Sequence, residues 1–222
     1  MNNVHDMGGM QGYGAIAIDD PSVVFHTAWE RQAFALIVAT NTAGQWNIDQ
    51  SRATREGLPP LQYLSNTYYQ TWLDAFEKQL LATGMITSEE LASGRADGPG
   101  LAGVKALNAK QLPAALKHGW PSQRDTTRAA LYEVGQAVRT IEAHPKTHTR
   151  LPAYCRDKPG RITAAHGMHV FPDASALGID DPQWMYTVEF DAHALWGEDT
   201  SATSVSLTCW EPYLMAEHHD AD

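Results

Sequence analysis

Ten histidines are the side chains of this chain best suited to hold a metal ion. Three close pairs stand out: His144 with His148, His166 with His169, and His218 with His219. Pro145 disfavours a helix through the first pair, and no acidic residue stands inside either of the first two pairs in the order that zinc proteases use. We therefore interpret the histidines as solvated or locally hydrogen-bonded, and expect no metal site in this chain.

The two cysteines, Cys155 and Cys209, are the remaining candidates for metal or redox chemistry. Their separation fits neither a zinc ribbon nor a disulfide framework. We expect two reduced thiols in or near a core, with a single disulfide as the open alternative.

Other catalytic motifs are missing from the sequence. The glycine-rich stretch 8–14 has no strand before it and no Lys-Ser/Thr after it, so it is not a phosphate loop. No Gly-x-Ser-x-Gly elbow and no Cys/His nucleophile pair is recognisable. Taken alone, the chain lacks a convincing catalytic centre.

The first half of the sequence predicts helices. Thr27 with Glu30, and Thr87 with Glu90, have the spacing of capping boxes that begin helices. Residues 61–81 give the strongest helical pattern, with aromatic and aliphatic side chains recurring every three or four positions until Gly84. A further helix is expected from Asn108 to Gly119.

Beyond Gly119 the pattern changes to that of strands. Apolar and polar residues alternate over 186–190 and 204–209. Several short strands predict a small antiparallel barrel. The expected class is therefore α+β, with an extended arm and helical domain over 1–125 and an all-β domain over 126–222.

Composition narrows the possible partners. The 222 residues are 43% hydrophobic, enough for packed cores, and the formal net charge is −10. An acidic chain is poorly suited to nucleic acid or to an anionic membrane surface. No apolar run reaches the roughly 18 residues that a spanning helix needs. The polar residues 1–14 do not form a secretory signal, so we expect a cytoplasmic protein.

Several stretches resemble the β subunits of nitrile hydratases. In chain order they are 1–10 (MNNVHDMGGM), 24–30 (VFHTAWE), 47–52 (NIDQSR), 67–73 (TYYQTWL), 148–154 (HTRLPAY), 186–188 (YTV) and 195–197 (LWG). Each stretch is weakly specific alone, but the ordered set spans nearly the whole chain. The resemblance implies an N-terminal arm, a helical domain and an SH3-like β-barrel.

The resemblance also implies a division of labour between two subunits. An α subunit would hold iron(III) or cobalt(III) through three cysteine sulfurs, two of them oxidised, and two backbone amides. This chain would bind no metal itself, and would complete the site in an αβ heterodimer that pairs into α2β2. The activity implied is hydration of a nitrile to the corresponding amide.

Two arginines of the matching motifs would enter that site, Arg52 and Arg150. Buried cysteine oxyanions need strong donors. A guanidinium offers a planar fork that stays charged, which a lysine cannot reproduce. No comparable role is expected for the neighbouring Arg55, Arg156 or Arg161.

The resemblance places a substrate pocket around Ile48, Ser51 and Trp72, with the Tyr68 hydroxyl near the reacting group. Trp72 lies on the helical aromatic stripe, which more often belongs to a core, whereas Tyr68 lies off it. Ser51 replaces a bulky apolar residue, and Thr71 replaces a histidine that relatives often have. The size of the substrate therefore stays open, and a proton relay through position 71 is not expected.

Two other functions stay open. One is a non-catalytic accessory protein that delivers metal to the α subunit, since such proteins resemble only the N-terminal half. The other is a subunit of a related thiocyanate hydrolase, in which the corresponding sequence is split between two chains.

Overall fold

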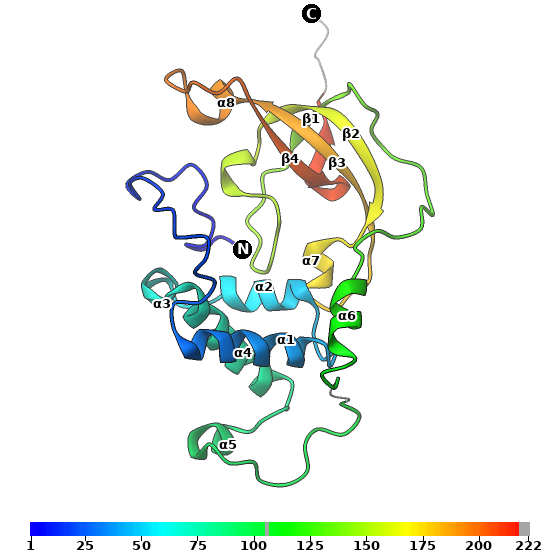
Figure 1. Ribbon diagram of the computed structural model, residues 1–222. Coiled ribbons are helices and arrows are strands. Elements are labelled where there is room, and N and C mark those ends of the chain that lie inside the picture. The colour runs from blue at the N-terminus through cyan, green and yellow to red at the C-terminus, as the bar shows by residue number, and fades with distance from the viewer. Residues whose placement is uncertain (105–106, 218–222) are drawn as a thin grey trace, which may run out of the picture. The chain divides into compact units, whose positions relative to one another are not determined.

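The computed structural model describes residues 1–104 and 107–217 (Figure 1). Contacts between residues divide the chain into two compact units. The helical unit comprises Asn3–His5 and Gly12–Trp120, and the β unit comprises Met1–Asn2, Asp6–Gln11 and the chain from Pro121 onward. The expected α+β class is confirmed. Among the described residues, no helix has both the length and the apolar character needed to cross a bilayer.

Capping residues set the starts of the helices. The helical unit contains α1 (Ala28–Asn41), α2 (Ile48–Glu56), α3 (Pro60–Ser65), α4 (Tyr68–Ala82), α5 (Ser88–Ser93) and α6 (Leu112–His118). The Glu30 carboxylate accepts hydrogen bonds from the amides of His26 and Thr27, which come directly before α1. Thr87 with Glu90 caps α5 in the same way. The predicted starts of these two helices are confirmed.

One long predicted helix is divided in two. A continuous helix over 61–81 was expected, but α3 ends at Ser65 and Asn66 is extended, with ψ at 145°. Thr67 then begins α4, because its amide donates to the Gln70 side chain at 2.7 Å and its own hydroxyl accepts from the Gln70 amide. A capping box inside the expected helix therefore ends one helix and begins the next.

The last helix of this unit begins later than predicted. The Asn108 side chain accepts hydrogen bonds from the amides of Lys110 and Gln111. These bonds stabilise a turn, and regular helix starts only at Leu112. The predicted end, at Gly119, is confirmed.

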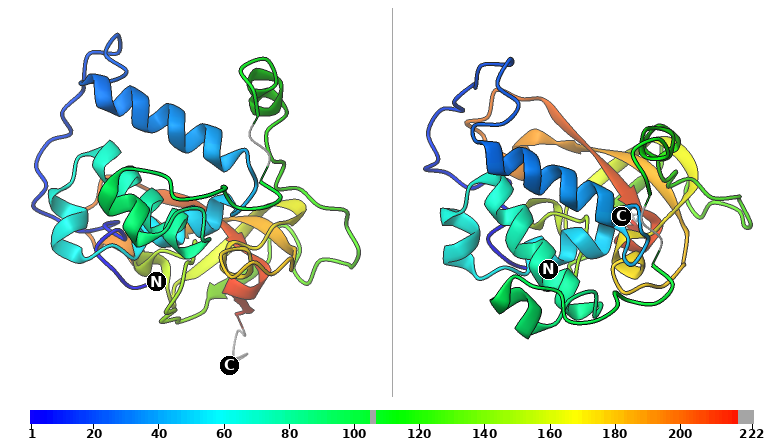
Figure 2. Two further views of the ribbon diagram at one scale, coloured as in Figure 1. Left: turned by 90° about the horizontal axis from the view of Figure 1, so that it is seen from below. Right: turned by 60° about the horizontal axis from the view of Figure 1, so that its bottom comes forward.

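Helix α4 is packed against both α1 and α2, as Figures 1 and 2 show. Ile37, Trp46 and Phe76 form the buried centre of this packing. Partly buried Trp72, Leu73, Leu80 and Met85 surround it. The aromatic stripe predicted for α4 is thus largely core, as its helical spacing implies.

The β unit is built on a five-stranded antiparallel sheet in the order β4-β3-β2-β1-β5. Its strands are β1 (Ala137–Thr140), β2 (Pro159–His169), β3 (Gln183–Asp191), β4 (Ser204–Trp210) and β5 (Leu214–Ala216). Short helical turns join them: η1 (Ala153–Cys155), α7 (Pro172–Ser175), α8 (Ala192–Trp196) and η2 (Glu211–Tyr213). The two strands predicted by alternation correspond to β3 and β4, and Tyr186, Val188 and Phe190 face the core.

The expected barrel is not closed. Register shifts between Ile162 and Ala164 and between Ala165 and Met168 bend β2, and Figure 1 shows this strand arching. The turn η2 takes the chain from β4 at one edge of the sheet to β5 at the other. Because η2 interrupts the extended backbone and β5 is only three residues long, no ladder joins β4 to β5 within the described chain.

The two cysteines belong to the core of the β unit. Cys155 and Cys209 are fully buried and free, as expected for reduced thiols. Burial raises the pKa of each thiol to about 12, so both stay protonated at neutral pH. They serve as small apolar side chains and not as nucleophiles.

The first residues of the chain dock on the β unit through specific contacts. The Asp6 carboxylate accepts a hydrogen bond from the Ala153 amide at 2.8 Å, and lies 3.7 Å from the guanidinium of Arg156. Gly9 has a φ of +78°, and a Cβ there would lie 2.5 Å from Cζ3 of Trp196. Only glycine fits both the backbone conformation and the close approach to the indole ring.

We predict that Gly9→Ala loosens the docked N-terminal residues. The left-handed conformation costs an alanine about 1–2 kcal/mol, before the clash with Trp196 is counted. Such a change corresponds to a roughly 5–30-fold larger undocked population. Limited proteolysis within residues 1–14, followed by mass spectrometry, should show cleavage that is faster by that factor.

The matched control is Gly100→Ala. A Cβ at Gly100 meets no atom within 4 Å, so this change should leave the cleavage rate as it is. Equal cleavage of the Gly9 variant and the original chain would contradict the docking seen here.

Candidate functional site

The guanidinium of Arg52 is oriented by its own helix. Its Nη1 lies 2.9 Å from the Asp49 carboxylate, one turn earlier on α2. Asp49 is buried, whereas the side chain of Arg52 is 40% exposed. A half-exposed ion pair contributes little to stability. The ion pair instead sets the direction of the Arg52 guanidinium, and it leaves the other N–H groups available to donate hydrogen bonds.

Arg150 lies in the segment between β1 and β2, where strand pairing does not hold the backbone. Its amide donates a hydrogen bond to the Tyr213 hydroxyl at 3.0 Å, and the Thr149 hydroxyl donates to the same oxygen at 3.2 Å. The Tyr213 hydroxyl in turn donates to the carboxylate of Asp173. This phenol thereby makes the one donated and two accepted hydrogen bonds that a hydroxyl can make.

Burial sets the protonation of this network. Tyr213 is 3% exposed, and burial followed by the neighbouring Asp173 carboxylate raises the pKa of its phenol. Burial also raises the pKa of Asp173. Tyr213 therefore stays a hydrogen-bond donor at neutral pH and keeps the backbone of Arg150 in place, while the Arg150 side chain is exposed.

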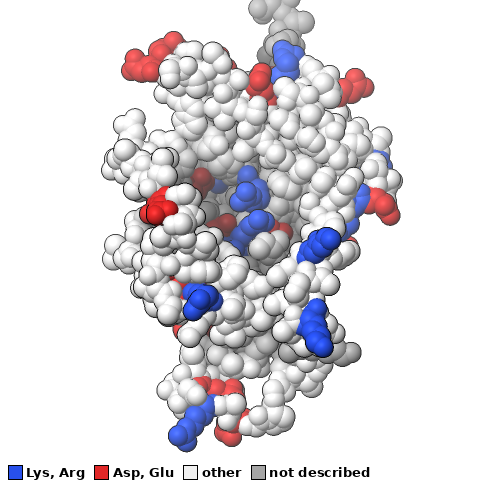
Figure 3. All heavy atoms as spheres, viewed as in Figure 1, with Lys and Arg blue, Asp and Glu red and all other residues white. Residues whose placement is uncertain are grey.

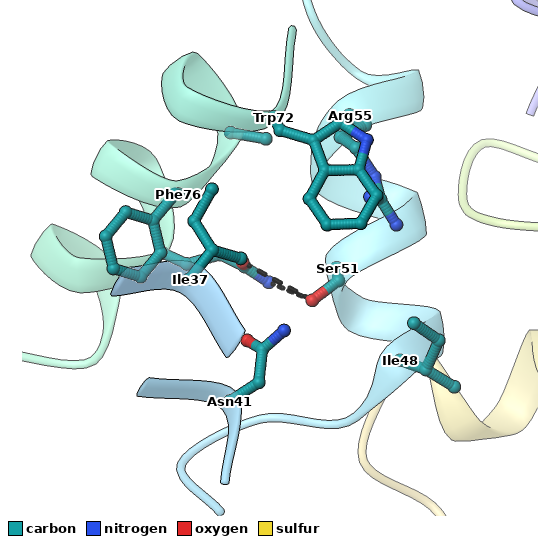
Figure 4. A pocket seen from close by; sticks show the side chains of 9 residues that line it. Ile37, Asn41, Ile48, Ser51, Arg55, Trp72 and Phe76 are labelled. Atoms are coloured by element: carbon teal, nitrogen blue, oxygen red, sulfur yellow. Dashed lines mark hydrogen bonds between the residues drawn. The ribbon is translucent and has the colours of Figure 1, made fainter. Parts of the chain in front are cut away.

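A small pocket opens between α2 and α4 in the helical unit, with a volume of about 30 Å³. Figure 4 shows the side chains around it. Nine residues line it: Ile37, Asn41, Ile48, Ser51, Arg55, Trp72, Ala75, Phe76 and Gln79. All three predicted substrate-pocket residues, Ile48, Ser51 and Trp72, thus meet at one cavity.

The other two predicted site residues of this unit do not line the pocket. Arg52 follows Ser51 on α2 and lies outside the lining set. Tyr68 begins α4, is 67% exposed, and its ring lies 5.5 Å from that of Trp72. The Thr71 hydroxyl donates to the Thr67 carbonyl at 3.3 Å, a bond within its own helix.

Arg55 also lines the pocket, although no role was predicted for it. Its guanidinium lies over the Trp72 ring, 4.7 Å from the centroid, and burial lowers its pKa. The sequence spacing could have predicted this, because residues three and four apart, such as Ile48, Ser51 and Arg55, share one face of a helix.

Arg156 also makes hydrogen bonds within the β unit that were not predicted. Its guanidinium donates to the carbonyls of Leu151 and Ala143 and to the side chain of Asn2. Arg55 and Arg156 therefore make poor controls, because a change at either residue would break contacts within the protein. Arg161 is exposed, and its guanidinium donates to the Gly135 carbonyl, a bond that a lysine can also make, so Arg161 serves as the control.

No metal site is formed by the described ranges, 1–104 and 107–217. Within them, no group of three or more His, Cys, Asp or Glu side chains is placed to hold an ion. The pair His218 and His219 lies outside these ranges. On the face shown in Figure 3, acidic and basic groups are interspersed and form no continuous basic stripe.

Comparison with known families covers nearly the whole chain. Residues 1–118 match the model of the nitrile hydratase beta subunit, N-terminal, and residues 121–216 match that of the nitrile hydratase beta subunit, C-terminal. The low-molecular weight cobalt-containing nitrile hydratase subunit beta of Rhodococcus rhodochrous is 34% identical, over 97% of this chain and 99% of its own length.

A second relative agrees. The cobalt-containing nitrile hydratase subunit beta of Pseudonocardia thermophila is 34% identical, with 96% of each chain covered. A solved apo-enzyme of thiocyanate hydrolase from Thiobacillus thioparus is 22% identical, with a TM-score of 0.39 over 41% of this chain and 79% of its own. A TM-score this low carries no weight for fold or function.

We predict that Tyr213→Phe frees the backbone at Arg150. The change keeps the buried ring but leaves the Arg150 amide and the Asp173 carboxyl without their shared partner, which costs about 1–3 kcal/mol. Thermal unfolding should report that loss, and hydrogen exchange at the Arg150 amide should accelerate about tenfold or more. Tyr13→Phe, on a residue that is 60% exposed, is the control and should change neither quantity. Unchanged exchange at Arg150 in the Tyr213 variant would show that the hydroxyl does not hold this segment.

Proposed function

The chain belongs to the nitrile hydratase β-subunit family, and from that premise we propose that it acts with an α subunit to hydrate a nitrile to its amide. The continuous match of residues 1–118 and 121–216 to the two halves of the family carries this proposal. Co-purification of this chain with its α partner, followed by a nitrile-to-amide assay, tests it.

The same observation weighs against the two other functions. An accessory protein that resembles only the N-terminal half would lack the β unit, which matches the C-terminal model. A thiocyanate hydrolase subunit would correspond to one part of a divided sequence, whereas this chain is continuous through both parts. Thiocyanate is nevertheless a useful second substrate for the assay.

The proposed complex is an αβ heterodimer, paired into α2β2, in which the α subunit holds iron(III) or cobalt(III). Two relatives are named as cobalt-containing. When bound, such a metal acts as a Lewis acid on the nitrile or on the attacking water. The residues of this chain would position, enclose and hydrogen-bond the reacting groups. A cytoplasmic location stays a prediction.

We propose that Arg52 and Arg150 donate hydrogen bonds to the oxidised cysteine oxygens of the partner subunit. The guanidinium of Arg52 and the backbone of Arg150 are held in ways that suit this role. Asp49 directs Arg52 through an ion pair, and Tyr213 holds the backbone of Arg150. Donors fixed before the reaction stabilise developing charge without the cost of reorganising at that moment.

The pocket between α2 and α4 is the proposed place for the substrate side chain. Ile48 and Trp72 supply apolar contact, and Ser51 enlarges the space that a bulky residue would fill. The exposed hydroxyl of Tyr68 is proposed to hydrogen-bond near the reacting nitrile or water.

We predict that Arg52→Lys and Arg150→Lys each lower kcat by about 10²–10³-fold while the subunits still assemble. Each change keeps the charge and removes the planar fork. The measurement is kcat on one nitrile, together with metal content and the size-exclusion profile. The double variant should lose less than the product of the two single losses, because the two residues serve one cluster. Arg161→Lys is the control, and near-normal turnover in both test variants would remove the proposed role of the arginines.

Metal analysis provides a separate prediction. The isolated chain, exposed to iron, cobalt or zinc and then desalted, should retain far less than one ion per chain, whereas the complex should retain a stoichiometric amount. One tightly bound transition metal per isolated chain would contradict the proposed division between the subunits.

A further inference from the structure

The floor of the pocket between α2 and α4 is polar. Asn41 at the end of α1, Ser51 on α2 and Gln79 on α4 line it, and Ser51 contacts Gln79. Figure 4 shows the side chains of Asn41 and Ser51 directed toward the same space. Ser51 and Gln79 are 7% and 8% exposed, so these groups are deep in the unit. Three helices thus each contribute one uncharged hydrogen-bonding side chain to a single small space.

The hydrogen bonding of this floor is incomplete. The Ser51 hydroxyl lies 3.5 Å from Oε1 and 3.3 Å from Nε2 of Gln79, longer than the usual range of about 2.7–3.2 Å. The buried Oδ1 of Asn41 has no hydrogen-bond partner among the described residues. Buried polar atoms in native proteins are normally paired, so a donor from outside the chain is expected here.

Size and charge limit what that outside group can be. A volume of about 30 Å³ holds roughly one water-sized group. The guanidinium of Arg55 lines the same pocket, and no acidic residue lines it. A cation would therefore be repelled. Ile48, which is 54% exposed, lies at the accessible side of the pocket.

We propose that Asn41, Ser51 and Gln79 form a subsite for an uncharged, hydroxyl-sized hydrogen-bonding group at the end of the substrate remote from the nitrile. This inference rests on the proposed function of the pocket. A hydroxyl can donate to Asn41 Oδ1 and accept from the Gln79 amide or the Ser51 hydroxyl. When no substrate is bound, a water molecule would make the same bonds, and a hydroxyl can replace it whereas a methyl group cannot.

The test uses three nitriles that differ at one atom. In the complete complex, kcat/KM is measured for 3-hydroxypropanenitrile, butanenitrile and 3-aminopropanenitrile, which carry a hydroxyl, a methyl and an ammonium group at the same position. We expect the hydroxyl compound to be best and the ammonium compound to be worst. In Gln79→Met and in Ser51→Ala, the ratio of hydroxyl to methyl compound should fall about three- to tenfold, the effect of one neutral hydrogen bond.

Two features keep the result interpretable. Both substrates are assayed on the same enzyme sample, so a variant that folds poorly lowers both rates and leaves their ratio unchanged. Gln32→Met makes the same chemical change on the exposed face of α1 and should not alter the ratio.

The inference is overturned if butanenitrile is hydrated but the ratio is the same in the original complex, in Gln79→Met and in Ser51→Ala. Preference for the ammonium compound would also overturn it. Failure to hydrate any of the three nitriles would instead count against the proposed function of the chain.

Discussion

The segment between Thr140 and Pro159 forms no strand, and side-chain hydrogen bonds hold much of its backbone in place. It contains only the short turn η1, so side chains replace the missing ladder. The Thr140 hydroxyl donates to the Cys155 carbonyl, Arg156 donates to two carbonyls, and the Tyr213 hydroxyl accepts from the Arg150 amide. A segment held in this way can expose the Arg150 side chain while its own backbone stays ordered.

In the helical unit, the helical repeat of α2 and α4 decides which side chains face each other. Residues spaced three and four apart on α2 and α4 face each other, so one pocket collects the side chains of both. Arg52 comes next to Ser51 in the sequence but projects from a neighbouring face of α2. Of these two adjacent residues, Ser51 is therefore directed into the pocket of the helical unit and Arg52 away from it.

Local patterns predicted much of this structure, because capping and alternation act over a few residues. The starts of α1 and α5 and the strands β3 and β4 follow from such patterns. The break at Asn66 was missed because the apolar period continues through it, although Thr67 and Gln70 have the capping spacing. The open sheet could not be predicted, since closure depends on whether β4 and β5 pair. Tyr213 was missed for a similar reason, because its partners Thr149 and Asp173 are distant in sequence and no local pattern connects them.

The β unit is built from segments that are far apart in the sequence, and this affects the order in which its contacts can form. Residues Met1–Asn2 and Asp6–Gln11 belong to this unit, and its edge strand β5 ends at Ala216 and pairs with β1. The helices of the other unit lie within residues 28–118, so they can fold while the rest is still being made. The docking partners of residues 6–11, among them Ala153 and Trp196, follow them by well over a hundred positions, so the docking cannot form before that part of the β unit is made. Contacts between residues so distant in sequence form slowly, so this docking is a late step in the folding of the β unit.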